Sequence, residues 1–361
     1  MSVRSERSRF QFLVVIAAGL LGAAVLAIGL TVWWLRTDEI DAVTKNIDNL
    51  AIVLAEQTNL AVKSIDVVIN DIQERLENIG ARTQDNFGHL RQDKNTYNSL
   101  IDSLSHLSHA ALIALIDKNG RVVTTTQKWP PPPIDLTNRD YFQHFKNNDD
   151  KGIYAGRPVA DHTTGLETIF IGKRINDSNN TFLGIIIVGI RIAYFERIYN
   201  SITSLPEQKF MLLRHDGTVL HRYPDPIDRA GEIMPEGSPW HRLVSQGGGA
   251  FRSPGYFEGR ARLVAVHPLS DYPLVINVGI SEAVALASWR KHAIFIGIGT
   301  LLALIFSVFL LKMLSRKIAL LISSEATSNK TAHELKRANV TIDAALNNIS
   351  QGLVIDRKSV V

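Results

Sequence analysis

LTNRDYFQHFKNNDDKGIYAGRPVADHTTGLETIFIGKRINDSNNTFLGIIIVGIRI, residues 136–192, is the stretch of sequence that decides the fold. Its first part, RDYFQHF, predicts a short helix with Asn138 as the N-cap, because an asparagine oxygen can accept a hydrogen bond from a free N–H of the first turn. Three largely apolar segments follow, GIYAGRPV, ETIFIGKRI and FLGIIIVGI, and the turn sequences HTTG and DSNN separate them. Apolar runs between such turn residues predict antiparallel strands.

Cations and hydroxyl groups are concentrated in the same stretch, beside the apolar runs. Because successive side chains of a strand point to opposite faces of the sheet, some of these groups must point inward. This combination predicts a pocket for a small anionic molecule, and the candidate ligand-binding residues are Arg139, Tyr141, Tyr154, Arg157, Thr168 and Lys173. Arg174 and Arg191 are expected to be structural or surface residues. The alternative is a sheet with one solvated basic face, and the strand register decides which residues face inward.

Two apolar segments predict a membrane protein. Residues 10–35 and 293–311 are each long enough to cross the hydrocarbon core of a bilayer as a helix. A cleaved signal peptide is the alternative for the first segment. Its apolar run is too long for that, however, and Trp33 and Trp34 stand where interfacial aromatic residues usually lie. The first segment is therefore interpreted as an uncleaved transmembrane helix.

The charges that flank the two segments predict the topology. Basic residues precede the first segment and follow the second, namely Arg4, Arg7, Arg9, Lys312, Arg316 and Lys317. Positively charged flanks usually stay in the cytoplasm, which places both termini there. We therefore expect a two-pass protein of the inner (plasma) membrane with residues 36–292 in the periplasm.

Composition and motifs give no indication of an enzyme active site in this chain. The sequence has no cysteine, and hence no disulfide framework and no thiolate metal site. It contains no Gly-x-Ser-x-Gly or His-Glu-x-x-His motif and no phosphate-binding loop. Its slight basic excess, 39 Lys+Arg against 35 Asp+Glu, forms no basic block for nucleic acid. No catalytic residue, metal site or cofactor is predicted, and the alternatives to a sensor are a membrane-anchored periplasmic enzyme and an envelope structural protein.

One long helix is predicted to leave the membrane. Residues 37–79 contain neither proline nor glycine, and apolar residues recur every seven positions. The stripe consists of Ile40, Ile47, Leu54, Ala61 and Val68, widened by Val43, Leu50, Ile65, Ile72 and Ile79. Gly80 is expected to end this helix.

Two similar hairpins are predicted further along the chain. Residues 111–126 contain a strand, the turn DKNG and the returning strand RVVTTT, and residues 210–222 read FMLLRHDGTVLHR. The repetition indicates a tandem of related α+β modules, joined by a helix over residues 192–203. The second module is expected to continue through a Pro- and Gly-rich loop, residues 224–255, and to close with the strands ARLVAVHPL and LVINVGI. Ser281 then predicts the N-cap of a helix that runs directly into the second membrane segment.

A coiled coil is predicted after the second membrane segment. Positions spaced alternately four and three apart give the a/d register of a parallel coil, and they are Leu314, Ile318, Leu321, Glu325, Ser328, Ala332, Leu335, Asn339, Ile342, Leu346 and Ile349. The register implies a homodimer, and the polar residues in the seam indicate a weak coil that can shift between two packings. An ordinary juxtamembrane helix is the alternative.

The layout resembles the double Cache sensor family, in which two PAS-like modules lie on a long N-terminal helix between two transmembrane helices. The motifs that carry the resemblance, over roughly residues 37–290, are NRDYF (138–142), KRI (173–175), FLGII (182–186), Tyr194-Phe195 with Tyr199, and RHDG (214–217). The resemblance implies a membrane-distal module that binds a small ligand, often a carboxylate or an amino acid. The amino-acid-binding subgroup has an Arg-x-Trp-Tyr pattern with a downstream Asp, whereas here Asp140, Tyr141 and Phe142 follow Arg139.

The resemblance also implies a division of the chain. The expected parts are a cytoplasmic N-terminus (1–9), a transmembrane helix (10–35), a periplasmic double Cache domain (36–292), a second transmembrane helix (293–311), a cytoplasmic signalling coil (312–340), the start of a truncated PAS domain (341–355) and a possibly non-native tail (356–361). Within the periplasmic part we expect the long helix (37–80), a membrane-distal module (81–203) and a membrane-proximal module (204–290). TIDAALNNISQGLVI is similar to the PAS openings of diguanylate cyclases and sensor histidine kinases, whereas a common sequencing adapter encodes DRKSVV in one frame. The expected function is that of the input half of a transmembrane signalling protein whose output domain is missing.

Overall fold

A computed structural model describes residues 3–203, 206–224 and 230–356. Residues 37–287 form one compact unit, and the residues up to Arg36 form a second unit with those from Ser288 onward. The predicted tail lies outside the described residues except for Asp356.

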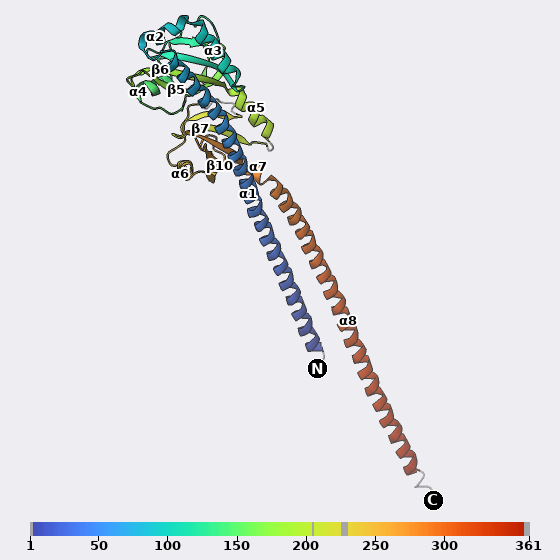
Figure 1. The fold of residues 1–361 in the computed structure, drawn as a ribbon. Coiled ribbons are helices and arrows are strands. Elements are labelled where there is room, and N and C mark those ends of the chain that lie inside the picture. Colours follow the sequence, from blue (N-terminus) through green and yellow to red (C-terminus); the bar gives the residue numbers. More distant parts are fainter. Residues whose placement is uncertain (1–2, 204–205, 225–229, 357–361) are drawn as a thin grey trace. The chain divides into compact units, whose positions relative to one another are not determined.

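The long helix α1 (Val3–Asn78) is the element on which the first unit is built (Figure 1). Between residues 47 and 76 its inward face is a continuous buried stripe, made of Ile47, Ala51, Leu54, Ala55, Val62, Ile65, Ile69, Ile72 and Leu76. The helix ends as predicted at Gly80, which has φ +69°, while the Ala81 N–H donates to the Leu76 carbonyl. This left-handed ending favours glycine. Ile79, predicted as part of the stripe, is 59% exposed because the helix has already ended there.

Two antiparallel sheets lie along α1. The first contains β1 (Ala110–Asp117), β2 (Val122–Thr125), β3 (Tyr154–Ala155), β4 (Val159–Ala160), β5 (Glu167–Asn176) and β6 (Phe182–Arg191), in the order β2-β1-β6-β5-β3 with β4 also paired to β5. The second contains β7 (Lys209–Arg214), β8 (Val219–Tyr223), β9 (Gly249–Ser253), β10 (Arg262–Pro268) and β11 (Leu274–Ser281), in the order β8-β7-β11-β10-β9. The two orders are equivalent, so the predicted tandem of modules is confirmed.

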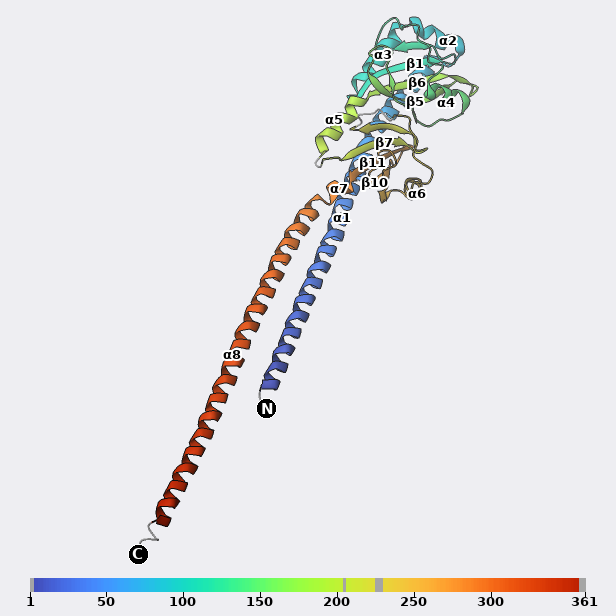
Figure 2. The same ribbon diagram turned by 180° about the vertical axis from the view of Figure 1, so that it is seen from behind.

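The equivalence extends to single positions. In the first sheet Ala114 lies opposite Thr125 on one side and Ile187 on the other, and in the second Met211 lies opposite Arg222 and Asn277 in the same way. Each sheet also has a glycine, Gly189 or Gly279, at matching places of its central strand. Figure 2 shows the two sheets one after the other along α1, seen from behind.

Short helices complete the modules. They are α2 (Gln84–His89), the 3-10 turn η1 (Leu90–Gln92), α3 (Lys94–Ser105), α4 (Asp140–Asn147), α5 (Ile192–Ile202), α6 (Trp240–Ser245) and α7 (Glu282–Ala285). Arg139, and not Asn138 as predicted, is the N-cap of α4: its backbone is extended and its carbonyl accepts the first helical hydrogen bond from Gln143. Within the predicted loop, residues 224–255, the chain forms α6 and β9, because the buried Trp240 fixes this segment to the sheet.

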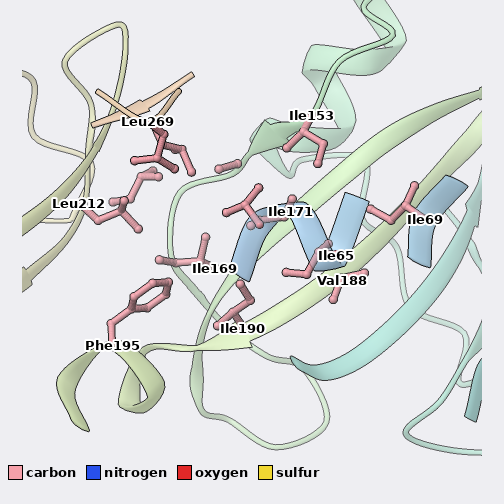
Figure 3. Close-up of a cluster of buried hydrophobic side chains, with 14 of the residues drawn as sticks. Ile65, Ile69, Ile153, Ile169, Ile171, Val188, Ile190, Phe195, Leu212 and Leu269 are labelled. Carbon is pink, nitrogen blue, oxygen red and sulfur yellow. The ribbon is translucent and has the colours of Figure 1, made fainter. Parts of the chain in front are cut away.

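A shared hydrophobic core holds the two sheets to α1. One cluster of buried side chains joins Ile65 and Ile69 of α1 to Ile171 and Val188 of the first sheet and to Leu212 of the second, as Figure 3 shows. Smaller clusters lie on the opposite faces of the sheets. Each sheet therefore has one face packed on α1 and a second face covered by a smaller cluster.

The last helix, α8 (Ala287–Asp356), does not continue the helix that Ser281 caps. The Ser281 side chain accepts from Val284 N as predicted, but α7 ends at Ala285 and Leu286 leaves helical geometry. The predicted unbroken helix into the second membrane segment is therefore wrong at this residue. In the described chain, the helical stretches Phe12–Asn78 and Ala287–Leu321 are long and apolar enough to cross a membrane.

Candidate functional site

The alternation of side chains in the first sheet creates the candidate site. In β1, Ile113 and Leu115 pack toward α1, whereas Leu112, Ala114 and Ile116 belong to the cluster on the other face. Helix α4 packs over that second face, and residues 161–163, after β4, line the space beside it. The space between them forms a pocket because Ala114 is too small to fill it.

The pocket has apolar walls and a polar rim, and encloses about 430 Å³, part of it open to solvent. The walls are Leu112, Ala114, Val122, Ile134, Leu136, Tyr141, Ala160, Phe170 and Ile187, and the polar side chains are Thr125, Gln127, Arg139, Asp161, His162 and Thr163. This combination, apolar walls with a few convergent polar groups, is typical of small-molecule sites.

Arg139 supplies the positive charge of the rim. The start of α4 places it there, and its Nη2 lies 2.9 Å from the Nε2 of His162. The imidazole accepts that hydrogen bond when Nε2 carries no proton. A partly buried guanidinium with donors to spare can hold a carboxylate through two parallel hydrogen bonds.

Asp161 supplies the negative charge, and the turn after β4 fixes its orientation. Its carboxylate accepts hydrogen bonds from the Thr164 hydroxyl (2.7 Å), from the Thr163 N–H (3.2 Å) and from the Gln127 amide. Burial works to raise the pKa of this carboxyl, but the hydrogen bonds from Thr164 and Gln127 outweigh it and the pKa is lowered. Asp161 is thus ionised at neutral pH and lines the same pocket as Arg139.

Tyr141 forms the apolar floor together with Phe170. Its side chain is 1% exposed, and the two rings lie 5.4 Å apart. Burial raises the pKa of its phenol, so the group stays neutral and can act as a hydrogen-bond donor.

The structure brings two of the six predicted residues, Arg139 and Tyr141, to this pocket. Tyr154 instead stacks on His144, with ring centroids 4.0 Å apart, and its hydroxyl accepts from Arg214. Arg157 is exposed, and its backbone N–H donates to Asp140. Thr168 is buried in β5 and its hydroxyl donates to the Leu166 carbonyl.

Lys173 lies on the other face of the sheet, where it binds α1. Its Nζ is 2.5 Å from the Asp66 carboxylate and 2.9 Å from the Asn70 side chain. Arg174, one residue later, points to α4 and donates to the carbonyls of Phe145 and Asn148. The alternation of β5 therefore separates the two cations.

Sequence reasoning missed Gln127, Asp161, His162 and Thr163. Asp161 and His162 are adjacent in the sequence, but the sequence alone does not show which other residues lie near them in the fold. Gln127 comes from the end of the first hairpin and reaches Asp161 only through the fold. Among the described residues, no group of three or more His, Asp or Glu side chains could hold a metal ion.

Comparison with known proteins decides the family. A sequence model of the Cache domain matches residues 40–289. The chain belongs to the double Cache family. Its Cache domain thus coincides with α1 after residue 40, both sheets and α7. Two apolar helices flank this domain, as is consistent with a membrane protein whose sensor domain is extracytoplasmic.

Solved structures share the fold of this Cache domain. The extracellular domain of the putative histidine kinase rpHK1S-Z16 is 23% identical with a TM-score of 0.57, and the match covers 69% of this chain and 99% of that one. The periplasmic sensory domain of the Campylobacter jejuni chemoreceptor Tlp1 is 14% identical with a TM-score of 0.52, covering 69% and 98%. No curated protein matches the sequence.

Proposed function

We propose that this Cache domain is the input domain of a two-pass inner-membrane signalling protein and binds a small carboxylate in the membrane-distal pocket. The observation that carries the proposal is the position of Arg139 on the rim of an otherwise apolar pocket. The carboxylate would lie on the guanidinium, and the body of the ligand between Leu112, Tyr141 and Phe170. Asp161 offers a second contact to any ligand that also carries an amino group.

Transmission of a signal across the membrane requires that the ligand bind one conformation of the protein more tightly than another. The basic residues flanking the two apolar segments support cytoplasmic termini and a periplasmic Cache domain. Helix α8 continues past the second apolar segment into the heptad pattern, which supports a homodimeric coil leading to an output domain such as a PAS-linked diguanylate cyclase or histidine kinase. An alkaline phosphatase fusion after Gly217 should be active, and one after Ser323 should be inactive.

Calorimetry on the full chain in detergent tests the ligand class. Acetate and propionate are titrated beside glycine and alanine, so that each carboxylate is compared with and without an amino group. Arg139→Ala should weaken binding by about a hundredfold or more, since truncating a buried charged contact typically costs about 2–5 kcal/mol. Arg191→Ala is the matched control because Arg191 is exposed and lies outside the pocket. Equal affinity of Arg139→Ala and the parent chain for every titrated ligand would exclude this site.

A further inference from the structure

The membrane-proximal module contains a second pocket on the face of its sheet that α1 does not cover. It encloses about 520 Å³, part of it open to solvent. Its floor consists of Lys209 and Met211 of β7, Arg222 of β8, Arg262 and Val264 of β10, and Asn277 and Gly279 of β11. The strand pairings match these positions to the distal pocket: Met211 corresponds to Ala114, Arg222 to Thr125, and Val264 to Phe170.

Unlike the distal pocket, this one contains an excess of buried positive charge. Its charged lining residues are Lys209, Arg222, Arg262 and Glu258. Arg222 is 5% exposed and Arg262 is 8% exposed. Both guanidinium groups contact the same carboxylate, that of Glu258, and the Lys209 Nζ lies 3.6 Å from it. Among the residues that the structure describes, three cations therefore share the Glu258 carboxylate in a largely buried space.

The hydrogen bonds of the two arginines are also incomplete. The Nε atoms of Arg222 and Arg262 are buried and have no hydrogen-bond partner among the described parts of the chain. Arg262 Nη1 donates to the Glu207 carbonyl (3.0 Å), and Lys209 Nζ donates to the Pro224 carbonyl (2.7 Å). Buried donors are nearly always paired, and an unpaired donor on a charged group is especially unfavourable. The two arginines thus keep hydrogen-bonding capacity for a further acceptor with negative charge.

The pKa shifts of Glu258 and Lys209 agree with this geometry. Burial works to raise the pKa of Glu258, but Arg222 and Arg262 outweigh it and lower the pKa, so the carboxylate is ionised. Burial lowers the pKa of Lys209 despite the nearby Glu258. Even with Lys209 neutral, two guanidinium groups face the carboxylate of Glu258.

The remaining walls indicate the class of ligand. Met211, Met234, Phe251, Phe257 and Val264 are apolar, which suits a ligand with an apolar body. Asn277 accepts from the Trp240 indole N–H at 3.0 Å, so its amide NH₂ is the group left to donate. Inorganic phosphate would place its oxygens against these apolar walls and is the less favourable occupant.

We propose that the membrane-proximal module binds a second ligand, a small organic carboxylate with an apolar body, through Arg222, Arg262 and Lys209. The alternative is a finished network, in which Glu258 alone pairs with the three cations and no ligand is needed. The proposal does not depend on the distal pocket, and the double Cache domain would then receive two chemical inputs on one helix.

A substitution in β9 distinguishes a ligand site from a finished network. Ser253 lies directly opposite Arg262 in the β9–β10 pair, and its hydroxyl accepts from the Gly255 N–H. Ser253→Asp keeps an acceptor for that N–H and adds the second carboxylate next to Arg262. Directly opposite side chains of a strand pair lie about 4.5–5.5 Å apart at their Cβ atoms, which is within reach of an ion pair. Ser245→Asp is the control, because it adds the same charge at an exposed serine on α6.

Thermal unfolding and calorimetry are measured on the full chain carrying Arg139→Ala, so that the distal site does not contribute. Benzoate and butyrate should bind and raise the unfolding temperature by several degrees. Ser253→Asp without probe should be at least as stable as its parent, and its affinity for benzoate should fall by about a hundredfold or more, whereas Ser245→Asp should bind like the parent.

Three results would overturn the proposal. The first is that neither carboxylate binds the Arg139→Ala chain. The second is that phosphate binds and the carboxylates do not. The third is that Ser253→Asp destabilises the chain while Ser245→Asp does not. The last result identifies a finished network in which an added carboxylate is uncompensated. None of these results bears on binding in the distal pocket, which is measured separately with Arg139 present.

Discussion

The guanidinium of Arg214, in the second sheet, lies 3.5 Å from the carboxylate of Asp140, beside the first sheet. The same Nη1 donates to the Tyr154 hydroxyl and to the Ala155 carbonyl, the latter at 3.3 Å. Asp140 is the neighbour of Arg139 and the first residue of α4. The helix that begins next to the candidate residue Arg139 is therefore tied directly to the second sheet.

Removing this connection should destabilise the Cache domain. Arg214→Met keeps most of the aliphatic stem but removes hydrogen bonds from a charged donor, each worth about 1.5–3 kcal/mol. Urea unfolding of the full chain in detergent should show a loss of about that size. Arg252→Met is the control, since Arg252 pairs with Glu282 at the surface with a side chain that is 66% exposed, and such pairs contribute about 0–1 kcal/mol. Equal losses for the two variants would contradict a role for Arg214 in joining the modules.

The core on α1 should be sensitive to the loss of volume. Ile65 is fully buried between α1 and the first sheet. Ile65→Ala should lower the free energy of unfolding by about 2–5 kcal/mol, because it leaves a cavity as well as removing apolar contacts. Val53→Ala, on the exposed side of the same helix, should change it by less than about 0.5 kcal/mol. A similar loss for both substitutions would mean that α1 is not buried on the face described.

Protonation of Asp161 should account for part of the loss of stability at acid pH. The pKa of Asp161 is lower in the folded chain than in the unfolded chain, where it is about 3.9. The unfolded chain therefore binds a proton first as the pH falls, so the stability due to Asp161 is fully present above that value and is lost toward the folded pKa. Asp161→Asn should be less stable at pH 7 but should lose less stability between about pH 5 and pH 2. Parallel pH profiles for the variant and the parent would contradict the lowered pKa.

The heptad register after the second apolar segment predicts a specific pattern of disulfide cross-links. The chain has no native cysteine, so single cysteines can be introduced without background. Cysteines at Leu321 and Leu335, which are a/d positions, should cross-link readily between subunits under mild oxidation. Cysteines at Ile322 and Lys336, one position later, should cross-link poorly. Equal cross-linking at all four positions would exclude a parallel coil.

The sequence was sufficient for the architecture because local patterns determine it. The apolar stripe of residues 47–76, the two Asp-containing hairpin turns and the Gly80 helix ending all depend on residues close together in the chain, and the structure confirms them. The helix break at Leu286 and the segment containing α6 and β9 were missed. In the second case tertiary packing of Trp240 overrides a sequence that is rich in glycine and proline.

The pocket was only partly predictable because its residues meet through the fold. Whether Lys173 or Arg174 faces α1 depends on a register that a shift of one residue would reverse. Gln127 and Asp161 are 34 residues apart, and their hydrogen bond follows from the way β4 pairs with β5. The excess charge around Glu258 was equally hidden, since Lys209, Arg222 and Arg262 come from three different strands.

The single core cluster on α1 makes the two modules thermodynamically inseparable. Leu212 and Ile276 of the second sheet belong to the same cluster as Ile113 and Val188 of the first, and α1 supplies the inner wall for all of them. Neither sheet can bury its inner face without this helix, so the domain should melt in one cooperative transition, and excising either module would expose the core of the other. A substitution in the core beneath one pocket should therefore lower the stability of the whole domain, including the other pocket.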